Sequence, residues 1–208
     1  MTRSVFIELI LRQIYGGQPS DDSEITINLV NEWLIQAVAI AAKNNYKENF
    51  QLDGIGYVNN SFYTTFKGLA IVADESFLWK CTLPEIPLGI GRNEAIANVR
   101  FKSSDNKISY DGIPLSIAQK GYTRSMRTIP NKIEYYPEGG SIYIMTPIGM
   151  YNYTTQVTMI SGGDSTDLDS EINVPSDYFP VIVEYIKAQL MFEKSIVQDT
   201  SNDGVDNK

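Results

Sequence analysis

Histidine is absent from the 208 residues of this chain. Histidine is the commonest general base near neutral pH, the usual ligand of zinc and copper, and the middle member of a Ser-His-Asp triad. Without it, catalysis is restricted to carboxylate chemistry, to Lys or Tyr chemistry, or to a borrowed cofactor. The residues therefore favour a non-catalytic protein, and we expect it not to be an enzyme and to have no catalytic or cofactor-binding residues.

Cysteine is represented by Cys81 alone, which excludes a disulfide within the chain. No apolar run approaches the roughly 18 residues of a membrane span, and the N-terminus lacks the basic, apolar and small-residue order of a signal peptide. We expect a protein that is made in the cytoplasm and has no membrane partner. The length of the chain fits one domain with an appended helical part.

Acidic residues outnumber basic ones, 25 Asp and Glu against 17 Lys and Arg, and the net charge is −8. Residues 92–132 differ from the rest, because they hold eight basic and three acidic residues and so carry +5, which leaves −13 for the remainder. Surfaces of opposite sign favour head-to-tail contacts between copies, and scattered solvated charge explains the pattern equally well. No recognised nucleic-acid-binding motif accompanies the basic stretch.

The most apolar and most helix-like segments stand at the two ends of the chain. Residues 4–15 are apolar nearly all round, and such a helix must be covered on more than one side. Gly16-Gly17 fits the end of this helix, because glycine takes the left-handed conformation that closes helices. Both helical ends carry more apolar face than one small core needs, so we expect a subunit of an assembly.

Two further helices are predicted. Asp21 and Glu24 have the spacing of a capping box, with Asp in place of the usual Ser or Thr, and open a helix to about residue 46 or 47. At 1.5 Å per residue this helix is roughly 38 Å long, so it either crosses the subunit or projects from it. Ser176 is a suitable N-cap for a third helix that runs to about residue 196.

Between the helices the hydrophobic period changes to two, with Gly, Asn, Asp and Pro between short runs, which is typical of strands. The hairpin with the clearest signal turns at residues 137–140, where two glycines supply positive φ angles. Residues 114–120 fit one short helix. The predicted strands cover 61–66, 69–73, 77–83, 95–101, 108–110, 133–136, 141–145 and 151–160.

The predicted fold class is therefore α+β, with an N-terminal helix pair and a C-terminal helix forming a helical part, and a central antiparallel β domain. We expect the N-terminal helices in residues 1–50 and the β-rich domain in residues 51–172. Residues 173–197 form the C-terminal helix, which packs on the N-terminal helices. Residues 198–208 are a polar tail with nothing to bury.

Two loops contain residues that occur in ligand sites. Gly89-Ile90-Gly91 resembles a phosphate-binding loop only superficially, because prolines precede it, the third glycine is missing, and the sequence after it favours a strand. We interpret it as an ordinary loop. The acidic loop at 162–171 offers hard oxygen ligands for calcium without the EF-hand spacing, and a solvated loop is the alternative. Its acidic residues are Asp164, Asp167, Asp169 and Glu171.

Tyrosines are frequent in the β region, and Tyr combines apolar area with a polar tip that suits sugar stacking or protein binding. In strands, tyrosines are also common as half-buried cross-strand partners. A pair of carboxylates about 5 to 10 Å apart would suffice for glycoside hydrolysis, but the sequence singles out no such pair. The strand tyrosines are Tyr135, Tyr136, Tyr143, Tyr151 and Tyr153.

Three segments together resemble those of a phage neck protein, and more narrowly the ring or adaptor proteins of short-tailed phages in the crAss-like group. The first joins two helices, the second lies in the β insertion, and the third follows the final helix. The resemblance covers most of the chain in the order and type of elements. The segments are Tyr15-Gly16-Gly17-Gln18-Pro19-Ser20-Asp21, then Leu83-Pro84-Glu85-Ile86-Pro87, and Gln198-Asp199 followed by Asn202-Asp203-Gly204.

This resemblance implies a structural virion protein of the head-to-tail connector. Such adaptors form a ring, usually of twelve copies, stacked under the portal protein and around the DNA exit channel. The implied partners are other copies of the chain, the portal, neighbouring neck ring or tail proteins, and genomic DNA that passes without sequence-specific binding. The implied location is the tail or neck of the virion, after assembly in the host cytoplasm. No catalytic residue is implied.

The residues and the resemblance agree in two respects. Apolar helices need neighbours, and an acidic excess suits a channel through which DNA slides without adhering. We expect acidic residues of the helical ends or loops to line that channel. We also expect a set of apolar side chains to face other copies or the portal rather than a core within the subunit: Phe6, Leu9, Ile10, Trp33, Leu34, Tyr185 and Phe192.

Two other functions stay open at this point. A monomeric β-rich module that binds carbohydrate or a host surface protein is the main alternative, and its mass in solution together with glycan binding by the tyrosines separates it from a ring. A carboxylate-based hydrolase is the third. Two acidic residues that face one cleft, and whose amide variants lose turnover, would support it.

Overall fold

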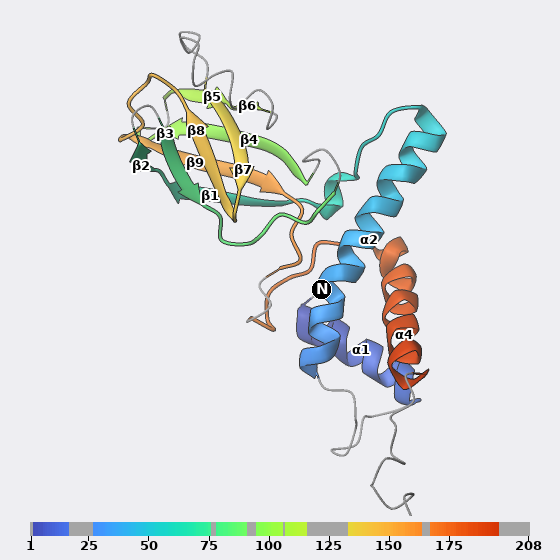
Figure 1. Ribbon diagram of the computed structural model, residues 1–208. Helices are drawn as coiled ribbons and strands as arrows, with labels where there is room; N and C mark the ends of the chain where they lie inside the picture. Colours follow the sequence, from blue (N-terminus) through green and yellow to red (C-terminus); the bar gives the residue numbers. More distant parts are fainter. Residues whose placement is uncertain are drawn as a thin grey trace, which may run out of the picture.

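The helices and strands separate into a helical part and a β part (Figure 1). This computed structural model describes residues 2–16, 27–75, 78–90, 95–105, 107–115, 133–163 and 167–195, without the side chains of residues 15 and 193–195. The α+β class predicted from the sequence is confirmed, with N-terminal helices, a C-terminal helix and a central β domain. The predicted polar tail at 198–208 lies outside the described residues.

The helical part consists of α1 (Arg3–Tyr15), α2 (Ile27–Asp53) and α4 (Phe179–Ser195), which the short helix η3 (Ser176–Tyr178) precedes. Helices α2 and α4 lie side by side, and α1 crosses them at the end where α2 begins (Figure 1). Their apolar stripes meet in one core, in which the rings of Phe6 and Phe179 lie 5.1 Å apart. The three helices therefore cover most of one another's apolar surface.

The ends of the helices show where the sequence predicted a helix boundary correctly and where it did not. Gly16 takes a left-handed conformation with φ 68° and ends α1, as predicted. Helix α2 runs to Asp53, six or seven residues past the predicted end, and Gly54 with φ 71° then donates its N–H to the carbonyl of Phe50. Two polar residues near the predicted end, Asn45 and Asn49, are buried by contacts that only the tertiary structure supplies.

The described strands of the β part form two sheets. In the first the strand order is β1-β9-β4-β5, and in the second it is β2-β3-β8-β7-β6. All described pairs are antiparallel except β6 with β7, which is parallel. The bounds are β1 Thr64–Ala70, β2 Val72–Glu75, β3 Leu78–Thr82, β4 Ile96–Ser103, β5 Ser109–Asp111, β6 Ile113–Pro114, β7 Glu134–Glu138, β8 Ser141–Met145 and β9 Tyr153–Met159.

One core joins the two sheets. Buried side chains of β4 and β9, among them Phe101 and Val157, belong to the same cluster as Ile142 and Ile144 of β8. Side chains from two sheets that fill a common interior are the signature of a β-sandwich. The alternating pattern in the sequence reports this arrangement, because in a strand every second residue points to the same face.

The hairpin of β7 and β8 has the predicted turn. Gly139 and Gly140 have φ angles of 56° and 74°, and Glu138 pairs with Ser141 on either side of them. Two successive left-handed residues make a type I′ turn, which matches the twist of the strands. Pro137 pairs with Ile142 of β8 and lies beyond the residues of β7 that pair with β6.

Two predicted elements are corrected. Residues 61–66 do not form one strand, because the short helix η1 (Asn60–Phe62) precedes β1 and carries Phe62 into the helical core. Residues 114–120 were predicted as a short helix, but Pro114 belongs to β6, and residues 116–120 lie outside the described residues. In both places a long-range contact decides the conformation, and local propensity does not report it.

The helical and β parts share buried contacts where they meet. Leu88, Ile90 and Ala95 come from loops of the β part, yet their side chains belong to the helical core. The N–H of Leu88 donates to the carbonyl of Ile160 at 3.0 Å, and the N–H of Ile160 donates to the carbonyl of Ala95 at 2.7 Å. The two parts are therefore packed together and not merely linked by the chain.

Candidate assembly surface

Four of the predicted interface residues lie inside the subunit. The side chains of Phe6, Ile10, Trp33 and Leu34 are at most 8% exposed, and all four belong to the helical core. The prediction that they face other chains is wrong. An apolar pattern around a helix reports that the helix is covered, but it does not say by what. Here α2, α4 and the residues around 160–174 supply the cover.

The other three predicted residues are more accessible. Leu9 lies on the outer face of α1, one turn after the exposed Val5, and Phe192 lies beside the exposed Met191 near the end of α4. Tyr185 is half-buried and donates its hydroxyl hydrogen to Oε1 of Gln36 at 3.1 Å. Leu9 and Phe192 therefore remain candidate contact residues.

The largest apolar exposure on the helical part was not predicted. The C-terminal half of α2 extends past the start of α4 (Figure 1), and the turn after it carries further apolar side chains. We call Phe50, Leu52, Ile55 and Tyr57 the apolar tip; their side chains are 56%, 81%, 68% and 44% exposed. A sequence signal did exist, because Leu52-Asp53-Gly54-Ile55-Gly56 places bulky apolar residues in a glycine turn, where burial is not expected.

A buried polar network holds the tip in place. Oδ1 of Asn45 accepts the N–H of Asn59 at 2.8 Å, and Nδ2 of Asn45 donates to the hydroxyl of Tyr178 at 3.0 Å. Nδ2 of Asn49 donates to the carbonyl of Tyr57 at 2.9 Å. These bonds fasten the returning chain to α2, and satisfied networks of this kind give an element a fixed position.

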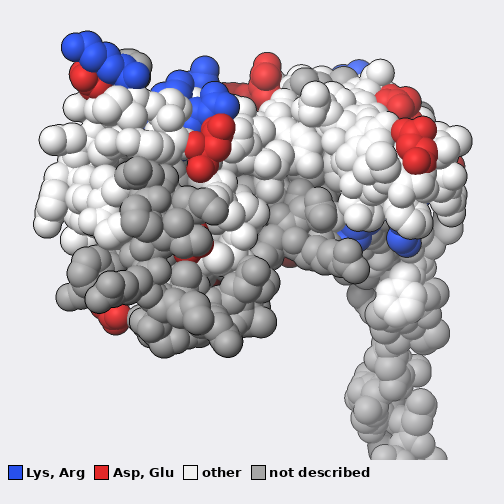
Figure 2. Space-filling view, turned by 90° about the horizontal axis from the view of Figure 1, so that it is seen from above, with Lys and Arg blue, Asp and Glu red and all other residues white. Residues whose placement is uncertain are grey.

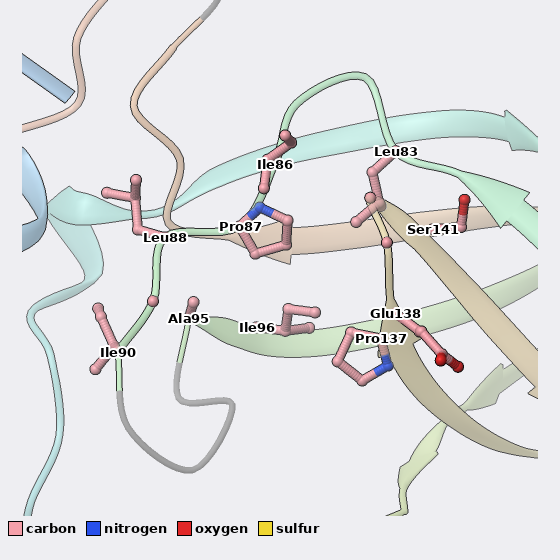
Figure 3. Close-up of a pocket in the computed structure, with 13 residues that line it drawn as sticks. Leu83, Ile86, Pro87, Leu88, Ile90, Ala95, Ile96, Pro137, Glu138 and Ser141 are labelled. Atoms are coloured by element: carbon pink, nitrogen blue, oxygen red, sulfur yellow. The ribbon is translucent and has the colours of Figure 1, made fainter. Parts of the chain in front are cut away.

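A small pocket lies where the β part meets the helical part, and we call it the waist pocket. It has a volume of about 230 Å³. Three stretches of chain frame it (Figure 3): the loop before β4, the start of β4 and the β7–β8 turn. The N–H of Leu83 donates to the carbonyl of Gly140 at 3.0 Å and ties the loop to the turn. Its lining is Leu83, Ile86, Pro87, Leu88, Gly89, Ile90, Ala95, Ile96, Pro137, Glu138, Gly139, Gly140 and Ser141.

The described part of the loop that contains Gly89 packs against the helical core. Leu88 and Ile90 on either side of Gly89 are buried in the helical core, so the loop presents apolar side chains inward. Gly91, the second glycine of the motif, lies outside the described residues. Burial of the flanking residues supports the interpretation as an ordinary loop.

The acidic loop also has a structural role. Oδ1 of Asp167 accepts the N–H of Asp169 at 3.0 Å, and the carbonyl of Asp167 accepts the hydroxyl of Ser170 at 2.6 Å. These bonds form a side-chain turn of the kind that Asp stabilises. Within the described residues, no group of three His, Cys, Asp or Glu side chains is arranged to hold a metal ion, and Asp164 is not among those residues.

The strand tyrosines do not form one exposed face. Tyr135 and Tyr136 are buried, Tyr143 and Tyr153 are partly buried, and Tyr151 alone of the five is mostly exposed, at 82%. Tyr136 pairs with Tyr143 across β7 and β8, and their rings stack with centroids 5.3 Å apart. Four of these tyrosines are therefore cross-strand or core residues, which agrees with the interpretation of strand tyrosines as half-buried cross-strand partners.

Charges on the described surface are mixed. In Figure 2 the Lys and Arg side chains gather mainly on one side of the β part beside Asp and Glu side chains, and much of the remaining surface carries neither. Arg100 and Asp111 form an ion pair at 2.8 Å that is open to solvent and contributes little to stability. Most of the basic stretch 92–132 lies outside the described residues, so its predicted contact role is not visible.

Burial raises the pKa of Tyr135 to about 12 from the ordinary value of 10.0. Below pH 10 the phenol is neutral in both the folded and the unfolded chain, and between pH 10 and 12 only the unfolded chain loses the proton. Stability is therefore lost as pH rises through this window, by about 2 kcal/mol. We expect Tyr135→Phe to lose less stability than the parent between pH 9 and 11.5 in urea titrations.

Tyr151→Phe is the matched control for this measurement, because it removes the same hydroxyl group from a tyrosine that is 82% exposed. Equal slopes for Tyr135→Phe and the parent would contradict the assignment. The comparison of slopes cancels the lysines and other tyrosines that titrate in the same range.

Burial also raises the pKa of the Cys81 thiol, whose side chain is fully covered by the β core. A buried thiol with a raised pKa is slow to react.

In the part of the chain that the structure describes, none of the helices combines the length and the apolar character needed to cross a bilayer.

No protein-family model matches this sequence, and no curated protein matches it either. The resemblance to phage neck proteins therefore stays a prediction that rests on the segments quoted above.

Proposed function

We propose that this chain is a structural subunit of the head-to-tail connector of a phage, where copies of it form a ring next to the portal and around the DNA exit channel. In this proposal the ring has the twelve copies that the resemblance implies, and it contacts the portal and the neighbouring neck or tail proteins. The chain has no catalytic role. It belongs to the virion after assembly in the host cytoplasm.

The observation that carries the proposal is the apolar tip. Four large apolar side chains within eight residues are exposed on a projecting corner that a buried polar network keeps rigid. Clustered apolar exposure marks contact surfaces, and a fixed contact surface loses little conformational freedom on binding. A subunit of an assembly needs such a surface, whereas a solitary protein gains nothing from it.

Two of the described sheet edges, β1 and β2, favour assembly through side chains. Edge strand β1 carries Lys67 and a bulge at Gly68, whose φ is 72°, and edge strand β2 is short and ends in Asp74 and Glu75. Bulges, charges and short edges discourage pairing with a strand of another copy. Ring contacts are then made by apolar side chains and not by a shared sheet.

The charge of the chain supports a role around DNA. With a net charge of −8, a ring of copies repels phosphate overall, and this disfavours adhesion of DNA as it passes. The exposed Asp167, Asp169 and Glu171 belong to a loop that suits the channel wall in this proposal. A ring whose channel is lined by Lys and Arg would contradict it.

Native mass spectrometry of the full chain, alone and mixed with the portal protein of its phage, tests the proposal. We expect a closed oligomer in at least one of the two samples, with a mass near twelve subunits. A chain that stays monomeric over the accessible concentration range and does not join the portal would reject it. Electron microscopy of the oligomer then shows whether it is a ring with an open channel.

One observation favours the alternative function, a monomeric module that binds carbohydrate or a host surface protein. Tyr151 is mostly exposed and meets the ring of Trp79 edge-on at 4.8 Å, and exposed aromatic rings suit sugar stacking. Glycan binding that Tyr151→Ala abolishes, by a chain that is monomeric, would favour this function over the ring.

A further inference from the structure

We propose that Arg3 positions the acidic loop, and that α1 and this loop form one cooperative unit, which unfolds locally as a whole while α2 and α4 stay folded. The described residues of the loop are 162–163 and 167–171. In the proposed ring this loop suits the channel wall, so the consequence for the channel rests on that proposal. The coupling between helix and loop belongs to the single subunit.

The acidic loop supplies the cap that α1 lacks in its own sequence. The first N–H groups of a helix have no carbonyl partner within the helix, and a polar N-cap side chain often supplies one. At α1 the N-cap Thr2 makes no such side-chain hydrogen bond. Instead the N–H of Arg3 donates to the carbonyl of Ser170 at 2.9 Å, and the N–H of Ser4 donates to that of Leu168 at 2.8 Å. The start of α1 therefore depends on a loop near the other end of the chain.

The Arg3 side chain fastens the first residues of the same loop. It is fully buried, its Nη1 donates to the carbonyl of Gly162, and its Nε donates to Oδ1 of Asn31 on α2. A Cβ on Gly162 would lie 2.8 Å from Cγ2 of Ile35. A Cβ on Gly163, whose φ is 76°, would lie 2.7 Å from Nη1 of Arg3. The two glycines therefore let the loop backbone lie close to both Arg3 and α2.

Within the loop, Asp167 holds the two capping carbonyls in place. Its Oδ1 accepts the N–H of Asp169, and its own carbonyl accepts the hydroxyl of Ser170 at 2.6 Å and the N–H of Ser170 at 3.2 Å. Leu168 lies inside this turn. Release of the loop leaves the first N–H groups of α1 without these acceptors, and release of α1 leaves the loop carbonyls without these donors. Each therefore stabilises the other, because such coupling is reciprocal.

The rest of the helical part has attachments away from α1. Helices α2 and α4 lie side by side, whereas α1 crosses them at the end where α2 begins (Figure 1). Further along α2, the side chain of Asn45 bonds to Tyr178 and to the backbone of Asn59. Proteins unfold locally in units of this kind at a lower free energy than global unfolding requires.

Hydrogen–deuterium exchange of the full chain, followed by mass spectrometry, tests the unit. We expect Arg3→Met to raise exchange about tenfold or more, both at the start of α1 and at residues 168–171, because it removes charged hydrogen bonds that anchor both segments. Phe62→Ala is the matched control, since a buried phenylalanine costs comparable global stability but its loss removes no hydrogen bond of the loop. In Phe62→Ala both segments should exchange within about threefold of the parent.

A second pair of variants approaches the unit from the loop. Asp167→Ala removes the carboxylate that accepts the N–H of Asp169, and we expect exchange at the start of α1 to rise about threefold to tenfold. Asp105→Ala is its control, because Oδ1 of Asp105 accepts the N–H of Lys107 at 3.1 Å in a similar turn between β4 and β5. It should leave exchange at α1 unchanged. Both aspartates are exposed, so both variants are expected to fold.

Three results would overturn the unit. Equal increases in Arg3→Met and Phe62→Ala would mean that the loop exchanges by global unfolding. Faster exchange of the loop without faster exchange of α1 in Arg3→Met would mean that the two segments unfold separately. Unchanged exchange at α1 in Asp167→Ala would contradict the reciprocal coupling.

The two proposals fail in different ways. A closed ring whose subunits show independent exchange of α1 and the loop rejects the unit and leaves the ring proposal standing. Coupled exchange in a chain that is monomeric alone and with the portal rejects the ring and leaves the unit standing.

Discussion

Replacement of Phe62 by alanine is expected to lower the free energy of unfolding by about 3–5 kcal/mol, the loss typical of a fully buried phenylalanine. Phe62 has no exposed surface, and its ring meets Tyr178 edge-on with centroids 5.4 Å apart. It lies in η1, between the end of α2 and the first strand, so the cavity opens where the helical and β parts join.

The matched control is Phe50→Ala, since Phe50 is more than half exposed on the apolar tip. Its removal should change the unfolding free energy by no more than about 0.5 kcal/mol. Both variants are measured by urea unfolding at a concentration where the chain is monomeric, because association would add to apparent stability. Equal losses for the two variants would show that Phe62 is not a core residue.

Replacement of Arg3 by methionine is the second change with a large expected effect, about 2–4 kcal/mol. The Arg3 side chain is fully buried; its Nε donates to Oδ1 of Asn31 and its Nη1 to the carbonyl of Gly162. Hydrogen bonds from a charged donor contribute about 1.5–3 kcal/mol each, and Met keeps the apolar stem while it removes both. Loss of the buried charge recovers part of this, since the guanidinium no longer has to be desolvated.

Arg3 is placed so that its loss affects several elements. Its backbone N–H donates to the carbonyl of Ser170 at 2.9 Å, so the start of α1 is tied to the loop before η3, while its side chain reaches α2. A Cβ at Gly163 would lie 2.7 Å from Nη1 of Arg3, so the approach of the guanidinium depends on a glycine there.

Arg12→Met is the control for Arg3, because the ion pair of Arg12 with Glu8 is about half exposed and should change stability by less than about 1 kcal/mol. Thermal or urea unfolding of the two methionine variants measures how much stability each substitution removes. If Arg3→Met had the same free energy of unfolding as Arg12→Met, the prediction would be wrong. The free energy recovered by no longer desolvating the guanidinium would then equal the free energy lost with its hydrogen bonds.

Secondary structure followed from the sequence where the periodic pattern and the turn residues agreed. Strand β8 has the predicted bounds, the β7–β8 turn uses the predicted glycines, and Gly16 ends α1. The prediction failed at the end of α2, which was expected at about residue 46 or 47, although the helix continues past Asn45 and Asn49 to Asp53. Asn disfavours a helix when its side chain faces water, but here tertiary partners satisfy it and the helix continues.

The exposed apolar residues followed from the sequence much less well. Leu52 and Ile55 were not predicted, because they follow a helix end that was placed too early. The waist pocket was not predictable either, since its walls are separated by about fifty residues in the sequence. Only pairing of β3 with β8, and of the loop with the β7–β8 turn, brings them together.

The sequence by itself determined the α+β class, the strand alternation and the turns, because these depend on residues that are close neighbours along the chain. It also determined which helices are covered. Only the tertiary structure decided what covers them: Ile10 and Leu34 meet other helices of the same subunit, while the apolar tip is left in solvent. The physical reason is that burial of apolar area has no direction, so a hydrophobic pattern cannot distinguish a neighbour in the same chain from one in another copy.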